Sequence, residues 1–207
     1  MNIWLRLPLM NEFLVTSSNP EGAHEFYYKH IYEDNRDLEV LCEKYNFKTR
    51  GPYNWKWELF SALLTGDKAK NADMGADLIN YEVKSAKDTS SFEYQYHPES
   101  WNTKLEEDKR VTHLFISYSP KYADIVVRTV PGEKLSNFFQ EWGPELTTFW
   151  VNESAEKISN KRFRKNIPYS TVCDRGKIVC VINATKLIYT ATGGIDSDLL
   201  LKPIKKK

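Results

Sequence analysis

The spacing of hydrophobic positions predicts two helices in the first third of the chain. Residues 36–47 place four apolar side chains on one helical face, namely Leu38, Leu41, Cys42 and Tyr45. Residues 54–66 do the same with Trp57, Phe60 and Leu64. Asn54 is suited to cap the start of the second helix, and Gly66 is suited to end it. Both stretches are therefore expected to pack one face against a core.

Three short apolar runs after these helices predict strands, at residues 75–79, 81–86 and 90–97. Asn80 separates the first two runs and is expected to form a turn or a bulge. The third run alternates cleanly, with Phe92, Tyr94 and Tyr96 on one face and Glu93 and Gln95 on the other. Such alternation is typical of a strand that buries one face.

A polar helix is expected next, over residues 99–110, followed by a nearly continuous apolar strand over residues 111–119. A strand without alternation is typical of the centre of a sheet, where both faces are covered. The predicted order from residue 54 is therefore helix, strand, strand, strand, helix, strand.

The remainder of the chain continues the mixture of helices and strands. We expect a strand at residues 123–130, an amphipathic helix at 133–142, and one or two strands within 177–191. Residues 154–177 are polar, basic and expected to be irregular. The predicted fold class is α/β, a mixed central β-sheet flanked by helices, in a single domain over residues 1–207.

Composition narrows the class of protein without choosing a function. The chain has 207 residues, of which 41% are hydrophobic and 28% charged, as in ordinary globular domains. Its net charge is only +1, so any surface that attracts nucleic acid must be local. The three cysteines are an odd number without a CxxC pair, which argues against a disulfide framework and for a reducing compartment. With no run long enough to span a membrane and no signal peptide, a cytoplasmic protein is expected.

The stretch GADLINYEVKSAK, residues 75–87, carries the candidate chemistry. A turn or bulge near Asn80 would bring the carboxylates of Asp77 and Glu82 together at one end of the sheet. Two carboxylates, with the backbone carbonyl of Val83 as a further ligand, suit a hard divalent ion such as Mg²⁺. Lys84, two residues after Glu82 on the same face, could hold the attacking water beside a phosphate. The simpler interpretation is an ordinary half-buried strand whose charged face is solvated.

Asp77 followed by Glu82-Val83-Lys84 resembles the motif of the PD-(D/E)XK nuclease superfamily, the fold of most Type II restriction endonucleases. The predicted order of helices and strands over residues 54–119 is similar to the core of that family, and residues 120–207 would then supply DNA recognition. The resemblance implies Mg²⁺-dependent, sequence-specific cleavage of double-stranded DNA that leaves 5′-phosphate and 3′-hydroxyl ends. Asp77 and Glu82 would hold the metal and Lys84 the water. By analogy, a palindromic target would favour a homodimer.

Several alternatives stay open at this stage. Ala76 stands where the family often has Pro, and the short interval to Glu82 leaves Asp73 as a second candidate for the first metal ligand. Glu58, on the helix at 54–66, is either an extra ligand or a solvated side chain. A structure-specific repair nuclease or resolvase of the same superfamily, and a non-catalytic DNA-binding module, are the competing functions.

Basic residues beyond the motif are candidates for contacts with the DNA backbone. They are Lys87, the cations of the KRFRK run at Lys161, Arg162, Arg164 and Lys165, and Arg175. The polar side chains of residues 166–177 could read base edges. The alternative is a solvated basic loop. The four histidines lack metal-ligand spacing, and His113, inside an apolar strand, is expected to be a core residue. No glycine-rich phosphate loop is present, so no nucleotide cofactor is expected.

Overall fold

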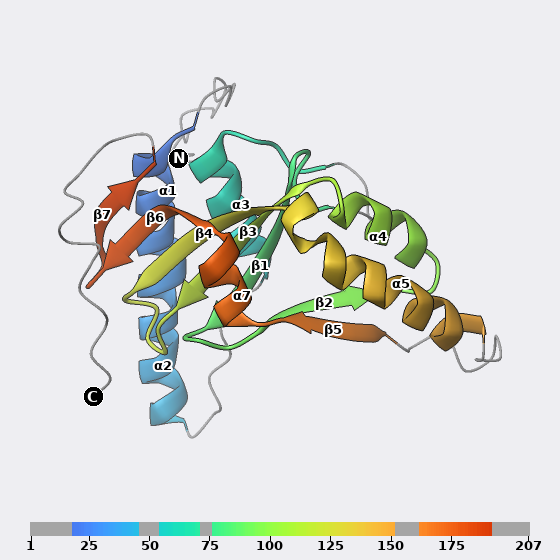
Figure 1. The fold of residues 1–207 in the computed structure, drawn as a ribbon. Coiled ribbons are helices and arrows are strands. Elements are labelled where there is room, and N and C mark those ends of the chain that lie inside the picture. Colours follow the sequence, from blue (N-terminus) through green and yellow to red (C-terminus); the bar gives the residue numbers. More distant parts are fainter. Residues whose placement is uncertain (1–17, 46–53, 71–75, 152–161, 192–207) are drawn as a thin grey trace, which may run out of the picture.

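A computed structural model describes residues 18–45, 54–70, 76–151 and 162–191. Its centre is a five-stranded sheet with the order β1-β3-β4-β6-β7, shown in Figure 1. The strands are β1 (Tyr81–Lys87), β3 (Thr112–Tyr118), β4 (Ile125–Pro131), β6 (Lys177–Asn183) and β7 (Lys186–Thr190). β1 and β3 pair in parallel, and every other pair in this sheet is antiparallel. The mixed α/β class expected from the sequence is therefore confirmed.

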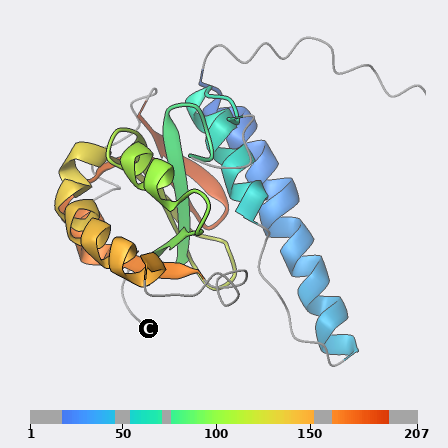
Figure 2. The same ribbon diagram turned by 90° about the vertical axis from the view of Figure 1, so that its right-hand side faces the viewer.

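Helices cover both faces of this sheet (Figure 2). One face packs against α1 (Pro20–Tyr27) and α3 (Asn54–Thr65), and their contact residues form one hydrophobic cluster. The other face packs against α4 (Trp101–Asp108) and α5 (Ser136–Val151), whose residues belong to a second cluster. A 3₁₀ turn, η2 (Gly132–Leu135), leads into α5. The sheet thus forms the middle layer of three.

α3 agrees closely with its prediction. Trp57, Phe60 and Leu64 are all buried on one face of the helix, as their spacing indicated. Gly66 follows the last helical residue with a φ of 76°, a left-handed conformation that glycine adopts without steric cost. Its N–H donates to the carbonyl of Ala62 at 2.8 Å and so closes the last turn.

The helix expected at residues 36–47 is present, but its apolar face was interpreted wrongly. It is the end of a longer helical segment, formed by α1, the π-helix η1 (Tyr28–Glu33) and α2 (Asp34–Lys44). Leu38 and Leu41 on α2, and Tyr45 directly after it, are more than half exposed, so they do not reach the core of the described protein. The reason is geometric, because α2 extends beyond the sheet that α1 covers (Figure 2). Residues 46 and 47 lie outside the described part.

The first predicted strand, at residues 75–79, is reduced to a single bridge between Ala69 and Leu78. Leu78 is buried, whereas Ile79 is 54% exposed, so the apolar pair does not provide a strand with a continuous buried face. The side chain of Asp67 accepts a hydrogen bond from the N–H of Asn80 at 2.7 Å and holds the turn into β1. Gly75 lies outside the described residues.

The strand predicted at 90–97 is β2 (Phe92–Tyr96). The predicted core made it part of the central sheet, but β2 does not join that sheet. It pairs antiparallel with β5 (Phe163–Ile167) in a separate two-stranded sheet. The cause is aromatic packing, since the ring of Tyr94 lies 5.8 Å from that of Phe139 and 5.5 Å from that of Trp142, both on α5. The order helix, strand, strand, strand, helix, strand is therefore only partly realised.

Residues 154–177 were expected to be irregular, and this is wrong for their described part. Phe163 and Ile167 are buried at the two ends of β5, and α7 (Tyr169–Arg175) follows with Val172 buried. The period-two pattern of β5 was hidden because Lys165 stands between Phe163 and Ile167 on the same face. The strands at 123–130 and within 177–191 and the helix at 133–142 are present as β4, β6, β7 and α5. No helix in the described ranges is long and apolar enough to cross a membrane.

Candidate active site

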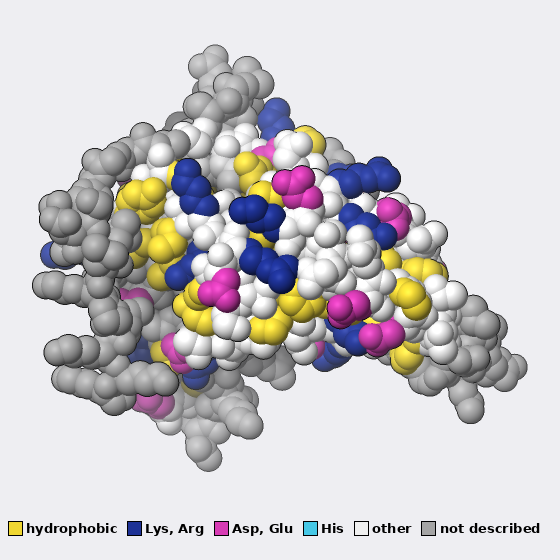
Figure 3. All heavy atoms as spheres, viewed as in Figure 1, with side chains coloured by type: hydrophobic (Ala, Val, Ile, Leu, Met, Phe, Trp, Pro, Cys, Tyr) yellow, Lys and Arg dark blue, Asp and Glu magenta, His cyan; other side chains and the backbone are white. Residues whose placement is uncertain are grey.

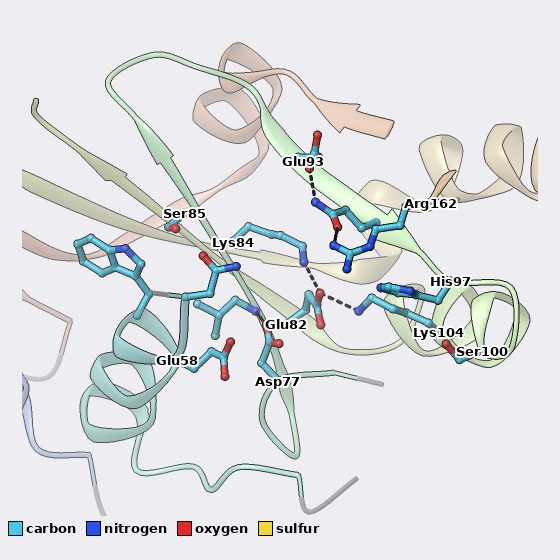
Figure 4. Close-up of a pocket in the computed structure, with 14 residues that line it drawn as sticks. Glu58, Asp77, Glu82, Lys84, Ser85, Glu93, His97, Ser100, Lys104 and Arg162 are labelled. Carbon is cyan, nitrogen blue, oxygen red and sulfur yellow. Dashed lines mark hydrogen bonds and ion pairs between the residues drawn. The ribbon is translucent and has the colours of Figure 1, made fainter. Parts of the chain in front are cut away.

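A pocket of about 510 Å³ opens at the outer edge of β1 (Figure 4). Its walls come from α3, β1, β2 and the start of α4. Asp77, before β1, and Arg162, before β5, complete them. Asp77, Glu82 and Lys84, the three catalytic candidates from the sequence, line this pocket together, and so do the candidates Glu58, Val83 and Arg162. The remaining lining residues are Asn54, Trp57, Ser85, Glu93, Gln95, His97, Ser100 and Lys104.

The alternation of β1 places the charged residues of the motif. Val83 is buried in the cluster under α1 and α3, whereas Ala86 belongs to the cluster under α4 and α5. Because neighbouring side chains point to opposite faces, Glu82 and Lys84 share the face of Ala86. They therefore point toward α4 and β2, while β1 itself is an edge strand of the described sheet.

Glu82 is 1% exposed and is the most buried acidic side chain of the pocket. Its Oε1 atom accepts hydrogen bonds from the ammonium groups of Lys84, at 2.5 Å, and Lys104, at 2.8 Å. Burial alone would raise the pKa of Glu82, but the two positive charges outweigh it and lower the pKa to about 2. Glu82 is therefore ionised at neutral pH. Its second oxygen, Oε2, is buried and has no hydrogen-bond partner among the described residues.

Lys104 is a site residue that the sequence analysis missed. It lies on α4, 13% exposed, and its ammonium also approaches Oδ1 of Asp108 at 3.5 Å, one helical turn later. Burial and the charge of Glu82 raise the pKa of Asp108 to about 7. The only local signal was the spacing of Lys104 and Asp108 at i, i+4, which more often marks a surface pair. Nothing in the sequence indicated that α4 would cross Glu82.

Buried hydrogen bonds link Tyr94, which Lys84 contacts, through His113 to the backbone of Asp108. The ammonium of Lys84 lies 4.9 Å from the centre of the Tyr94 ring, and the Tyr94 hydroxyl lies 2.7 Å from Nδ1 of His113. Nε2 of His113 lies 2.7 Å from the carbonyl oxygen of Asp108, which only accepts, so Nε2 carries the proton. Burial lowers the pKa of His113 to about 4, so the ring is neutral. The expectation that His113 is a core residue is confirmed.

Asp77 is held at the edge of β1 by the backbone. Its Oδ2 atom accepts a hydrogen bond from the N–H of Val83 at 2.8 Å. In a strand, the N–H and the carbonyl of one residue bond on the same side, so the Val83 carbonyl also faces this edge. Burial, and then the negative charge of Glu82, raise the pKa of Asp77 to about 7. Asp73, the alternative first ligand, lies outside the described residues.

The segment that carries Asp77 is also fastened to α4. Glu107 accepts a hydrogen bond from the N–H of Ala76 at 2.8 Å through Oε2, and its Oε1 pairs with the ammonium of Lys70. One side chain therefore binds the chain directly before Asp77 and at a second point several residues earlier. This contact sets the position of Asp77 relative to the helix that supplies Lys104.

Glu58 enters the same pocket from α3, where its carboxylate points into the space that Asp77 and Glu82 face (Figure 4). Burial and the charge of Glu82 raise the pKa of Glu58 above its ordinary value. Three carboxylates thus face one space, and the charge of Glu82 raises the pKa of both Glu58 and Asp77. Even so, within the described ranges no three His, Cys, Asp or Glu side chains are close enough to form a metal site by themselves.

The basic residues proposed for DNA contact fall into two groups, those that are exposed or line the pocket and those that pair with other side chains of the protein. Lys87 is exposed at the end of β1, and Arg162 lines the pocket. Arg164 is 56% exposed and approaches Glu93 at 3.5 Å. Lys165 pairs with Glu145 of α5 at 2.5 Å. Arg175 donates to Asn137 and to the carbonyl of Lys134. Both cations therefore already have partners within the protein. Lys161 lies outside the described residues.

The face over β4, β6, α7 and α5 carries scattered Lys and Arg side chains, interspersed with acidic and apolar ones (Figure 3). This face therefore does not present one continuous basic field. Of the residues proposed for DNA contact, Arg162 lines the pocket directly before β5, and Arg164 lies on β5 itself.

No protein-family model matches the sequence, and no curated protein matches it either. The chemistry of the pocket must therefore be inferred from its own residues.

Proposed function

We propose that the chain is a Mg²⁺-dependent endonuclease that hydrolyses phosphodiester bonds in double-stranded DNA. One observation carries the proposal. A buried carboxylate, Glu82, keeps one oxygen unpaired inside an open pocket while two lysines hold its other oxygen. A buried unpaired carboxylate oxygen is costly unless it has a ligand to bind. A cation at that oxygen would remove the cost.

The residues at the pocket fit a hard divalent cation. Oε2 of Glu82, a carboxylate oxygen of Asp77 and the carbonyl of Val83 are the three oxygen donors that would hold it. Mg²⁺ normally keeps several waters and takes only one or two carboxylates from the protein, so a complete set of protein ligands is not required. When bound, Mg²⁺ supplies a Lewis acid for a phosphate oxygen and lowers the pKa of a bound water.

The side chains of the protein have separate tasks in this proposal. Lys84 directs one N–H at Glu82, and the ammonium group has further donors for a water or a phosphate oxygen. Its positive charge would offset negative charge that develops on the phosphate in the transition state. A water would attack phosphorus in line, and the bond to the 3′ oxygen would break, leaving 5′-phosphate and 3′-hydroxyl ends. Glu58 and Lys104 would adjust the charge of the pocket around these groups.

Sequence-specific cutting in the manner of Type II restriction endonucleases is the form of this activity that we propose. A palindromic target would be matched by a homodimer, because the symmetry of the protein then coincides with that of the DNA. Sedimentation of the protein alone and with duplex DNA measures this directly. A monomer in both states would exclude the dimer while leaving the nuclease proposal standing.

The test is cleavage of a long, mixed-sequence DNA with Mg²⁺ by the wild type, Lys84→Ala and Glu82→Gln. We expect discrete fragments from the wild type and a loss of at least about 100-fold in rate from each variant, the size typical for removal of a group that stabilises transition-state charge. Lys186→Ala on β7 and Glu141→Gln on α5 change exposed residues of the same types and should cut as the wild type does.

Each of the other possible outcomes would indicate a different function. Nicks or cuts confined to junctions and flaps would indicate a structure-specific nuclease. DNA binding without any cleavage, over several metal ions, would indicate a non-catalytic DNA-binding module. Equal cutting by the wild type and by Lys84→Ala would show that the nuclease site lies elsewhere.

A further inference from the structure

The two-stranded sheet of β2 and β5 has one buried face and one polar face. Its register places Glu93 opposite Asn166 and Gln95 opposite Arg164, and residues directly opposite each other share a face. His97 and Arg162 follow directly beyond the last hydrogen-bonded pair, Tyr96 and Phe163, and by the same alternation lie on the polar face. The polar face therefore carries three cross-strand pairs in a row, and five of their six side chains are exposed, Gln95 being partly buried.

The buried face fixes the direction of the polar one. Phe92, Tyr94 and Tyr96 are all fully buried on β2, with Phe163 and Ile167 buried on β5. The ring of Phe163 packs edge-on against that of Phe149 on α5, at 5.3 Å. Because α5 covers one side of this ribbon, the polar pairs face away from α5, on the side that opens to the pocket.

The polar face is linked within itself by hydrogen bonds that a ligand could replace. Arg162 donates to Oε1 of Gln95 at 3.0 Å, and Arg164 approaches Glu93 at 3.5 Å. The amide of Gln95 also donates to Glu93. These contacts are between exposed groups, so water or another partner can exchange for them at small cost. They hold the side chains extended across the ribbon.

The chemistry of this face differs from that of a phosphate-binding surface. Phosphates accept hydrogen bonds and carry negative charge, so a surface that binds them offers donors and cations. Here a carboxylate and two amides, Glu93, Gln95 and Asn166, share the face with the arginines, and Glu93 would repel a phosphate. Base edges offer both donors and acceptors, and Arg pairs with guanine, Gln or Asn with adenine, and Glu with the amino group of cytosine. A mixed face matches bases better than backbone.

The shape and the position of the ribbon fit the same partner. A two-stranded ribbon can enter the major groove of B-DNA, which is about 12 Å wide, and the four-residue step from Glu93 to His97 spans roughly 14 Å. Four residues of this face, Glu93, Gln95, His97 and Arg162, also line the pocket that holds Glu82 and Lys84. Figure 4 shows Arg162 and His97 across the pocket from Glu58. The ribbon would thus contact the major groove while the pocket beside it contacts the scissile phosphate.

We propose that the polar face of the β2–β5 ribbon reads base edges in the major groove of duplex DNA, with Gln95, Arg164 and Glu93 as the residues that set sequence preference. The proposal rests on the proposed nuclease function for its substrate. It moves Arg162 and Arg164 from the phosphate backbone, where their sequence pattern placed them, to the bases. It also moves base reading from residues 166–177 as a whole to the β2–β5 ribbon, which includes only Asn166 and Ile167 of that segment.

The experiment is selection from a pool of random duplexes, with the full chain carrying Lys84→Ala so that bound DNA is not cut. Bound molecules are separated by gel shift and sequenced. We expect one enriched motif, and Gln95→Ala or Arg164→Ala should relax one position of it, with about 5- to 150-fold weaker discrimination there. Lys186→Ala, on the strand farthest from β1, should enrich the unchanged motif. Thermal melting of each variant confirms that it is folded.

Two results would overturn the proposal. An enriched motif that no ribbon variant alters would show that other residues read the bases. A uniform loss of affinity over all sequences, with a salt dependence reduced by about one counterion per arginine removed, would show phosphate contact instead.

The nuclease proposal is tested separately by the Mg²⁺ cleavage assay. Discrete cutting with a motif insensitive to the ribbon would reject the ribbon alone. A motif that depends on Gln95, in a protein that cuts nothing, would support the ribbon and reject the nuclease.

Discussion

The ammonium nitrogen of Lys104 lies 2.8 Å from Oε1 of Glu82, although 22 residues separate them in the chain. The two groups come together because β1 and β3 are parallel, and the connection between them must cross the sheet face as a helix. That helix is α4, which directs Lys104 onto the strand that carries Glu82 and Lys84. A connection required by topology therefore completes the charge balance of the pocket.

Replacing Lys104 should destabilise the fold through Glu82 and Asp108. We expect Lys104→Met to lower the free energy of unfolding by about 3 kcal/mol, because it leaves buried acidic groups with less compensation. Urea unfolding monitored by circular dichroism measures this. Lys109→Met, on the same stretch of chain, removes a more exposed pair with Glu106 and should cost about 0.5 kcal/mol. Equal losses in the two variants would mean that the Lys104 contact contributes no special stability.

Asp77 should make the metal-free protein less stable as the pH rises. Its pKa is about 7 in the fold against an ordinary 3.8, so between these values the folded state binds more protons than the unfolded state. The sign is therefore a loss of stability with rising pH. The stability of Asp77→Asn relative to the wild type should therefore rise by about 2–3 kcal/mol between pH 5 and pH 8.

Thermal unfolding of both proteins across this pH range measures the effect of Asp77. Asp174→Asn, an exposed residue of α7, is the matched control and should follow the wild type. In addition, Mg²⁺ should raise the melting temperature of the wild type more at pH 8 than at pH 5, because metal and proton compete for Asp77. A metal effect that is equal in Asp77→Asn would exclude Asp77 as a ligand.

His113 should act in the opposite direction at acid pH. Its pKa is about 4 in the fold against an ordinary 6.5, so the unfolded chain binds the proton first as the pH falls. Its contribution to stability is therefore present above pH 6.5 and is lost toward pH 4. We expect the stability difference between wild type and His113→Gln to change by about 3 kcal/mol between pH 7 and pH 4.

Glutamine is chosen because it can still accept from Tyr94 and donate to the carbonyl of Asp108, the two partners of His113. His97→Gln, which changes an exposed histidine, should leave the pH profile of the wild type. If the free energies of unfolding of His113→Gln and the wild type change equally between pH 7 and pH 4, the buried ring does not control stability at acid pH.

Gly132 should tolerate no side chain, because backbone surrounds it. A Cβ at this position would lie 2.6 Å from the carbonyl oxygen of Asp108 and 2.7 Å from that of Val111. Gly132→Ala should therefore lower the free energy of unfolding by about 1–3 kcal/mol, as overpacking does. Gly143→Ala is the matched control, since its nearest neighbour would be 3.6 Å away and a helix gains about 0.5–1 kcal/mol from the exchange. Urea unfolding of both variants decides the sign.

The sequence by itself determined the faces of several helices and strands. Trp57, Phe60 and Leu64 are buried together on α3, and Phe92, Tyr94 and Tyr96 are buried together on β2, because periods of 3.6 and 2 residues encode a face locally. The same local rule placed Glu82 and Lys84 on one side of β1. These features require no knowledge of what lies opposite.

Only the tertiary structure decided what each face meets. Local periodicity predicted a buried face for Leu38 and Leu41, yet both are exposed, because α2 extends past the sheet. It also gave no sign that β2 pairs with β5 or that Lys104 reaches Glu82. Those contacts join residues far apart in the chain, and they are selected by packing among all the layers rather than by the residues nearby. The position of the pocket, and the ribbon beside it, follow from that packing.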